Sequence, residues 1–175
     1  MKTLILMGPK HSGKTSAGKA LAAKCSCDFI DLDELILQRT GKTPRQLFNE
    51  GAAIFQKAEA EALAALAANA DGKQRVIAAG GGIIDNAEAL AVLKQFGAAA
   101  VCLSISTGGA WDRISAGGEL PPFLQTENPR ETHRALHERR AAAYQQLADI
   151  VINVDGKTPD EIAEEILMLF RIFCL

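Results

Sequence analysis

Short apolar runs alternate with longer helix-like segments along the whole chain. The apolar, β-prone runs occupy residues 3–7, 28–31, 75–79, 99–105 and 149–154. The segments of helical character between them cover residues 14–25, 33–40, 44–68, 86–96, 108–116, 130–148 and 158–173. Strands that alternate with helices are typical of a parallel sheet with helices on both faces. The pattern therefore predicts an α/β fold of three layers (α/β/α) with a parallel sheet.

Punctuating residues refine this outline. Thr43-Pro44 and Thr158-Pro159 each place a capping residue before a first-turn proline, which indicates two helix starts. The segment from Ser115 to Pro129 is different, because glycine and proline pairs interrupt any regular element there. We expect a mobile lid over approximately residues 112–129, since such an irregular surface segment is the natural candidate for a closing loop.

Length and composition limit the possible classes of protein. The 175 residues suit a single domain, 1–175, and 48% apolar with 23% charged residues is typical of a globular chain. A net charge of −2 gives no electrostatic reason to expect a nucleic-acid partner. No apolar run approaches the roughly 20 residues that cross a bilayer, and the four cysteines show no paired framework. We expect a cytoplasmic monomer with neither a membrane nor a nucleic-acid partner.

The first apolar run leads directly into a phosphate-binding motif. Gly8 to Thr15 reads G-x-x-x-x-G-K-T, and a helix-forming segment follows it. The glycines let successive backbone N–H groups point at phosphate oxygens, and the helix adds the positive end of its dipole. Lys14 can reach the terminal phosphates, and the Thr15 hydroxyl can hold Mg²⁺. We therefore predict that the chain binds a nucleoside triphosphate. The predicted nucleotide-binding residues of the loop are Gly8, Lys10, Ser12, Gly13, Lys14, Thr15 and Ser16.

Two aspartates follow the second apolar run. Strand alternation would point Asp31 and Asp33 to the same side of the sheet, at the end where ligands of open α/β sheets bind. Asp31 can hold Mg²⁺ through water, and Asp33 can orient or deprotonate an acceptor hydroxyl. The alternative is that Asp33 only caps the following helix.

The third apolar run ends in three glycines, Gly80-Gly81-Gly82. Consecutive glycines cost conformational entropy, so they suit a place where backbone N–H groups approach a ligand closely. A plain tight turn is the alternative. Further along, Arg139-Arg140 and Tyr144 lie on a predicted helix, and arginines on helices usually belong to solvated faces.

Together these motifs resemble the shikimate kinase family of small P-loop kinases over essentially the whole chain. Family members show the phosphate loop, Asp-x-Asp, Phe-Arg-x-x-Glu, a triple glycine, a lid with Arg-Pro-Leu-Leu, and Arg-x-x-x-Tyr. The corresponding stretches here are Gly8 to Thr15, Asp31-Leu32-Asp33, Phe55 to Glu59, Gly80-Gly81-Gly82, Leu120 to Leu124, and Arg140 to Tyr144. The resemblance implies a five-stranded parallel sheet and ATP-dependent phosphorylation, with Mg²⁺, of a hydroxyl on a small acceptor. The default acceptor is shikimate, and the product is shikimate 3-phosphate.

The resemblance also implies roles for single residues. Lys14 and Thr15 would serve phosphate and Mg²⁺, with Asp31 supporting the metal. The residues that would contact the acceptor are Asp33, Gly80, Gly81, Gly82 and Arg140, the last through the shikimate carboxylate. Arg113, at the start of the lid, would pack on the adenine.

The chain departs from the family at the acceptor-binding arginines. Typical members use three, and this chain keeps Arg140. Gln56 stands at the arginine of Phe-Arg-x-x-Glu, and Leu120 or Pro121 stands at the lid arginine. Arg45, Lys42 or a lid residue could compensate. The departures favour, as an alternative, a family member with a different and less acidic acceptor. A non-catalytic nucleotide-binding module is a second alternative, and the intact Lys14, Thr15, Asp31 and Asp33 argue against it. Gluconate-type and nucleoside-monophosphate-type kinases are further alternatives.

His133 and His137 lie one helical turn apart. They could pair on a metal ion, but with no third ligand in view we expect a solvated helix face instead.

Overall fold

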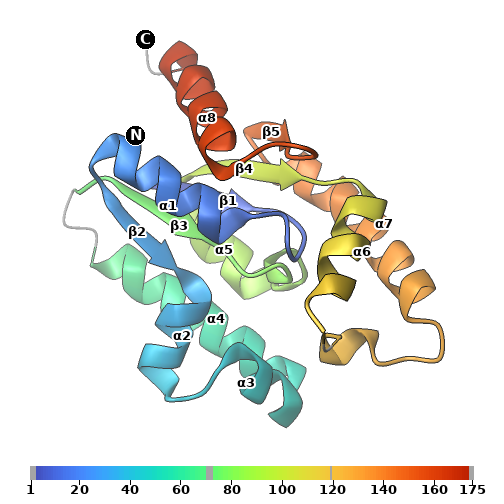
Figure 1. The fold of residues 1–175 in the computed structure, drawn as a ribbon. Helices are drawn as coiled ribbons and strands as arrows, with labels where there is room; N and C mark the ends of the chain where they lie inside the picture. The colour runs from blue at the N-terminus through green and yellow to red at the C-terminus, as the bar shows by residue number, and fades with distance from the viewer. Residues whose placement is uncertain (1–2, 70–72, 119, 174–175) are drawn as a thin grey trace.

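A five-stranded parallel sheet forms the centre of the computed structural model, which describes residues 3–69, 73–118 and 120–173 (Figure 1). The strands lie in the order β2-β3-β1-β4-β5. Their bounds are β1 Thr3–Met7, β2 Asp28–Asp31, β3 Arg75–Ala78, β4 Ala99–Ser104 and β5 Ile150–Asn153. Every neighbouring pair is parallel, so the predicted α/β fold and parallel sheet are confirmed.

Helices follow the strands as the sequence predicts, with one difference. Their bounds are α1 Lys14–Cys25, α2 Leu32–Thr40, α3 Pro44–Glu50, α4 Ala52–Ala68, α5 Ala87–Phe96, α6 Thr107–Ala116, α7 Pro129–Leu147 and α8 Pro159–Phe173, with short 3₁₀ turns η1 Ile83–Asp85 and η2 Pro122–Leu124. The predicted helical segment 44–68 is two helices. Gly51 ends α3 by donating its N–H to Leu47 O, and α4 begins at the next residue.

Helix caps lie where the sequence indicates them. Thr43 and Gln46 form a reciprocal capping box before Pro44. Thr158 and Glu161 make the same pair of contacts at the start of α8, where Glu161 N–H donates to the Thr158 hydroxyl and Thr158 N–H to the Glu161 carboxylate. Both helices therefore begin at a satisfied N-terminus.

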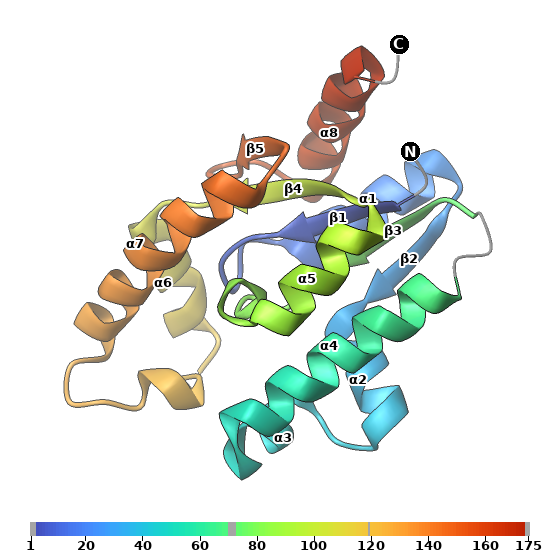
Figure 2. The same ribbon diagram turned by 180° about the vertical axis from the view of Figure 1, so that it is seen from behind.

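Alternation along the strands divides the core between the two faces of the sheet. On β1, Leu6 packs with α1, α6 and α8, whereas Ile5 and Met7 pack with α2, α4 and α5. Val76 and Ile77 on β3 divide in the same way. All five side chains are at most 3% exposed, as expected for a sheet covered on both faces. Figure 1 and the view from behind in Figure 2 agree: α1 and α8 cover one face, and α4, α5 and α7 the other.

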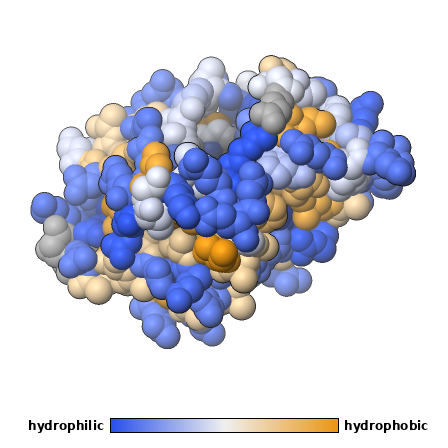
Figure 3. All heavy atoms as spheres, turned by 90° about the horizontal axis from the view of Figure 1, so that it is seen from below, coloured by the Kyte–Doolittle hydropathy of each residue, from blue (hydrophilic) through white to orange (hydrophobic). Residues whose placement is uncertain are grey.

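The loops at the carboxyl ends of the strands gather along one edge of the sheet, where α2, α3 and the segment between α6 and α7 also lie (Figures 1 and 2). Seen from below in Figure 3, the surface is mostly hydrophilic with smaller hydrophobic patches between. Among the described residues, no helix has both the length and the apolar character that a bilayer crossing needs.

The predicted lid is irregular only in part. Residues 112–116 still belong to α6, and the turn η2 interrupts the segment before α7 begins at Pro129. Residue 119 lies outside the described part of the chain. Leu124, in η2, is fully buried, so this segment is anchored to the rest of the domain by an apolar side chain.

Candidate active site

A cleft of about 610 Å³ opens at the carboxyl ends of β1, β2 and β3. The phosphate loop, the two aspartates and the triple glycine all contribute to its wall. Helix α3 and the lid close it from the other sides; their contributions are Pro44, Arg45, Phe48, Pro121, Pro122 and Phe123. The cleft therefore brings together the predicted nucleotide-binding and acceptor-binding motifs.

Backbone geometry explains two glycines of the phosphate loop. Gly8 has a φ of +137°, and a β-carbon there would lie 2.4 Å from the carbonyl oxygen of Leu103 on β4. Gly13, the N-cap of α1, has a φ of +91°. His11, between them, also lies in the left-handed region with a φ of 62°. These conformations turn the loop sharply before the helix starts.

Lys14 is buried inside the loop it belongs to. Its ammonium group donates to the carbonyl oxygens of Gly8 (3.0 Å) and Pro9 (2.7 Å). Burial lowers the pKa of Lys14 to about 8, although the nearby carboxylate of Asp33 favours the charged form. An anion beside this side chain would raise its pKa again and favour the charged form, so the lysine is suited to hold a phosphate.

The two aspartates occupy different elements, so strand alternation is the wrong reason for aligning them, although both line the cleft as predicted. Strand β2 ends at Asp31, and Asp33 already lies in the first turn of α2. The Asp31 carboxylate caps this helix by accepting from the Asp33 N–H, and it also accepts from the Thr15 hydroxyl at 2.8 Å. Asp31, not Asp33, is the cap, and this leaves the Asp33 side chain for the cleft.

Asp33 faces a second carboxylate across Gly80. A β-carbon on Gly80 would lie 3.0 Å from Glu59 Oε1 and 3.4 Å from Asp33 Oδ1. Burial raises the pKa of Asp33, and the charge of Asp31 adds to the effect. Burial also raises the pKa of Glu59, to about 7, against a hydrogen bond from Asn86 Nδ2. Carboxyl groups of raised pKa in a cleft are suited to exchange protons with a hydroxyl.

The triple glycine brings the phosphate loop and the acceptor side of the cleft into contact. A β-carbon on Gly81 would meet the backbone nitrogen of Lys10 at 2.8 Å, and one on Gly82 would lie 3.5 Å from Arg140 Nη2. The carbonyl oxygen of Gly81 accepts from the Tyr144 hydroxyl (3.0 Å) and from Arg140 Nη1 (3.1 Å). Gly81 thus permits a close approach to the phosphate loop, whereas the contact of Gly82 with Arg140 is of ordinary length.

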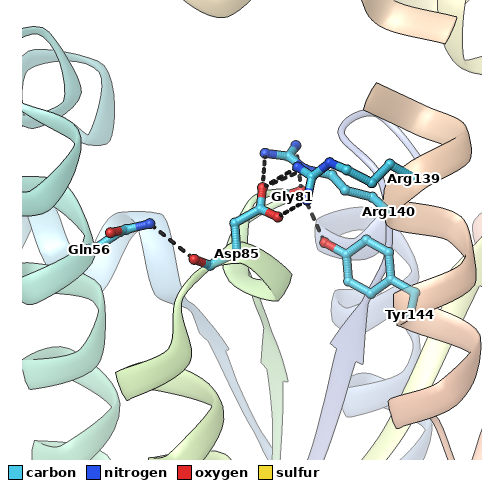
Figure 4. A network of polar contacts seen from close by, with 6 residues as sticks. All are labelled: Gln56, Gly81, Asp85, Arg139, Arg140 and Tyr144. Carbon is cyan, nitrogen blue, oxygen red and sulfur yellow. Dashed lines mark hydrogen bonds and ion pairs between the residues drawn. The ribbon is translucent and has the colours of Figure 1, made fainter. Parts of the chain in front are cut away.

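Arg140 is held by a carboxylate that the sequence analysis did not single out. Asp85 accepts hydrogen bonds from Arg140 and from the neighbouring Arg139, as Figure 4 shows. The ring of Phe123 in the lid lies over the Arg140 guanidinium at 5.9 Å. Arg140 is 17% exposed and lines the cleft.

The substituted arginine positions differ in their relation to the cleft that Arg140 lines. Gln56 donates from Nε2 to the backbone oxygen of Asp85 at 3.1 Å, and it is not among the described residues that line the cleft. Pro121 does line the cleft. Arg113 lies over the phosphate loop and donates to the carbonyl oxygen of His11 at 3.0 Å.

Four residues at or near the cleft have roles that the sequence did not suggest or left open, and of these Arg45 lines the cleft itself. Arg45 also lowers the pKa of Lys10, after the larger effect of burial, so the two cations lie near each other. Lys42, the other compensating cation considered, pairs instead with Glu50 at 2.8 Å. Glu59 ends the stretch matched to Phe-Arg-x-x-Glu but was given no role, and Asp85, in a short turn, gave no signal of its own.

His133 and His137 contradict the expectation of a solvated helix face. They are 5% and 7% exposed, and their rings lie 5.5 Å apart beside Trp111 of α6. His137 Nε2 lies 3.0 Å from the carbonyl oxygen of Ile105. The two side chains therefore pack α7 against α6 instead of facing solvent. Their spacing along one helix does not reveal this packing.

The residues present fit ATP and Mg²⁺. The Ser12 hydroxyl is buried in the loop with no partner in the described part of the chain, and phosphate oxygens would supply one. Thr15 and Asp31 offer the oxygen ligands that Mg²⁺ prefers. Among the described residues, no three His, Cys, Asp or Glu side chains converge as a metal cluster.

Comparison with known proteins gives a consistent result. The family model described as shikimate kinase matches residues 10–171. A shikimate kinase of Thermodesulfovibrio yellowstonii is 36% identical over 168 residues, 95% of this chain and 94% of the relative. A solved shikimate kinase from Acinetobacter baumannii, in complex with shikimate, is 30% identical with a TM-score of 0.88, covering 100% of this chain and 96% of its own. The Aquifex aeolicus enzyme is also 30% identical, with a TM-score of 0.82 over 99% and 98% of the two chains.

Proposed function

Because the chain belongs to the shikimate kinase family, we propose that it transfers the γ-phosphoryl group of ATP to a hydroxyl of shikimate, giving shikimate 3-phosphate. The observation that carries this proposal is one cleft lined by Lys14, Asp33 and Arg140 together. A phosphate-binding cation, a carboxylate and an acid-binding guanidinium are the groups that such a transfer needs. The similarity to a structure that holds shikimate supports the same acceptor.

Bound ATP·Mg²⁺ supplies the phosphoryl group and neutralises part of its charge. Within the chain, the loop residues Gly8 to Ser16 hold the phosphates, and Thr15 with Asp31 holds the metal. Lys14 places its positive charge beside the phosphoryl group that is transferred. Arg113, beside the loop, packs on the adenine.

On the acceptor side, Asp33 accepts the proton of the attacking hydroxyl, since its pKa is raised by burial. Gly80, Gly81 and Gly82 let the acceptor approach the phosphate loop closely. Arg140 binds the acceptor carboxylate. The lid, residues 112–129, excludes water when both substrates are present.

Coupled release of ADP from ATP tests the proposal, with and without millimolar shikimate and with Mg²⁺ omitted in a parallel sample. We expect Mg²⁺-dependent stimulation by shikimate. ATP binding without stimulation would contradict the proposal and favour another acceptor. A panel of small hydroxy compounds, gluconate included, then separates a retuned kinase from a non-catalytic nucleotide-binding module. The monomeric state, the cytoplasmic location and the lack of a nucleic-acid partner stay predictions from the sequence.

A further inference from the structure

Asp85 occupies one side of the guanidinium that the proposed function assigns to the acceptor carboxylate (Figure 4). Its Oδ2 accepts from Arg140 Nε at 2.9 Å and from Arg140 Nη2 at 2.6 Å. Arg139 donates to both oxygens of the same carboxylate, at 2.7 and 3.0 Å. Burial by itself would raise the pKa of Asp85, but the hydrogen bonds from Arg139 and Arg140 outweigh it and lower the pKa. Asp85 is therefore a carboxylate at neutral pH.

The remaining donors of Arg140 are restricted as well. Nη1 donates to the carbonyl oxygen of Gly81, and Phe123 covers one face of the guanidinium plane. A guanidinium has five N–H groups, and three of those on Arg140 already have acceptors within the chain. An acceptor carboxylate can therefore approach only the N–H groups left on Nη1 and Nη2, next to the negative charge of Asp85.

Arg139 offsets part of this charge. Its side chain is 60% exposed, whereas that of Arg140 is 17% exposed. Two guanidinium groups and one carboxylate leave one net positive charge beside the cleft. Without Arg139, the charge of Asp85 would cancel that of Arg140. The exposed Arg139 thus preserves the electrostatic attraction of Arg140 for an anion.

We propose, resting on the function given above, that Asp85 is a specificity-determining residue that weakens the pocket's preference for a charged acid over a neutral acceptor. It does so by holding one edge of Arg140 and by repelling an incoming carboxylate. Arg139 acts in the opposite direction by neutralising Asp85. Because the Gln56 side chain donates to the Asp85 backbone, this pocket depends on Arg140 for binding the acceptor carboxylate more than a three-arginine pocket does.

The test compares shikimate with its methyl ester, which has the same ring and hydroxyls without the charge. Affinities by calorimetry and kcat/KM values are measured for the wild type, Asp85→Asn, Arg139→Gln and Arg134→Gln. The amide of Asp85→Asn keeps an oxygen that accepts from Arg140 but has no charge. Arg134 lies on the same helix, paired with Glu131 and Glu138, and serves as the matched control.

We expect Asp85→Asn to raise the preference for the acid over the ester about tenfold, because removing one charge at this range changes an anion's affinity by about that factor. Arg139→Gln should lower the preference several-fold, and Arg134→Gln should leave it unchanged. If Asp85 served only to orient Arg140, both Asp85→Asn and Arg139→Gln would show a lower preference for the acid over the ester. That result would overturn the inference. An unchanged preference in Asp85→Asn would overturn it too.

Failure of the proposed function has a separate signature. If the wild type turns over neither compound, the assignment of the acceptor has failed. The inference then depends on whether Asp85→Asn binds shikimate more tightly than the wild type in the calorimeter. Equal affinity, or no binding by either chain, overturns it. Turnover of shikimate by the wild type with an unchanged preference in Asp85→Asn overturns the inference alone.

Discussion

A β-carbon on Gly81 would lie 2.8 Å from the backbone nitrogen of Lys10, so the triple glycine and the phosphate loop touch through their backbones. A separation this short leaves no room for a side chain, because the opposing atom belongs to a loop fixed between β1 and α1. The nucleotide and acceptor halves of the cleft are joined at this point. A substitution in one half should therefore affect ligand binding in the other half.

We predict that Gly81→Ala lowers both ATP affinity and turnover, and reduces the free energy of unfolding by about 1–3 kcal/mol through overpacking. Gly82→Ala is the control, since its β-carbon would stand 3.5 Å from Arg140 Nη2, an ordinary contact. Denaturant unfolding and nucleotide titration measure the two effects. Equal stability of the two variants would contradict the close contact.

Lys14→Met should reduce kcat at least about 100-fold, because the transferring phosphoryl group loses the cation buried beside it. Methionine fills similar space, so the fold should persist, which circular dichroism checks. Lys19→Met, on the exposed side of the same helix α1, should retain activity. Retained turnover by Lys14→Met would refute the role given to the loop.

Asp33→Asn should lower kcat about 100-fold while the Kd for ATP changes less than about twofold, since this carboxylate faces the acceptor side at Gly80. Asp28→Asn, exposed on β2, is the matched control. Steady-state kinetics and nucleotide titration separate the two quantities. Parallel loss of both would mean that Asp33 serves the fold and not the acceptor.

Arg45→Gln should raise the KM for shikimate about tenfold with a smaller effect on kcat, because the guanidinium lines the cleft near Lys10 and adds to its positive charge. Lys42→Gln removes a charge of the same sign that pairs with Glu50 and is not among the described residues lining the cleft, so its KM should stay within about twofold. Initial rates over a range of shikimate concentrations make the comparison. Equal effects of the two substitutions would rule out Arg45 as the compensating cation.

The raised pKa of Glu59 predicts that the free energy of unfolding depends on pH. Burial raises its pKa to about 7 from the ordinary 4.5, so the folded chain holds this proton more tightly than the unfolded chain does. Its contribution is complete below pH 4.5 and is lost as the pH rises through 7, which amounts to roughly 3–4 kcal/mol. Glu59→Gln should therefore gain stability relative to the wild type between pH 5 and pH 8. Denaturant unfolding at both values measures this difference, and a constant difference would contradict the shifted pKa.

The layered fold and the phosphate loop could be predicted because their signals are local. Hydrophobic periodicity marks each strand and helix, and G-x-x-x-x-G-K-T requires a sharp turn followed by a helix within one short segment. Asp31 and Asp33 illustrate the limit of such signals. Alternation predicts one side for both, but the helix starts one residue earlier than expected, and Asp31 becomes its cap.

The sequence alone determined which elements form, in what order, and that a triphosphate loop follows the first strand, since these depend on neighbours along the chain. Only the tertiary structure decided what Arg140 contacts. Its partner Asp85 lies 55 residues away and carries no motif. Only the tertiary structure likewise placed Glu59 beside Gly80 and buried the two histidines against α6. Burial and the pairing of charges depend on how helices pack across the sheet, and no periodicity within one segment encodes that packing.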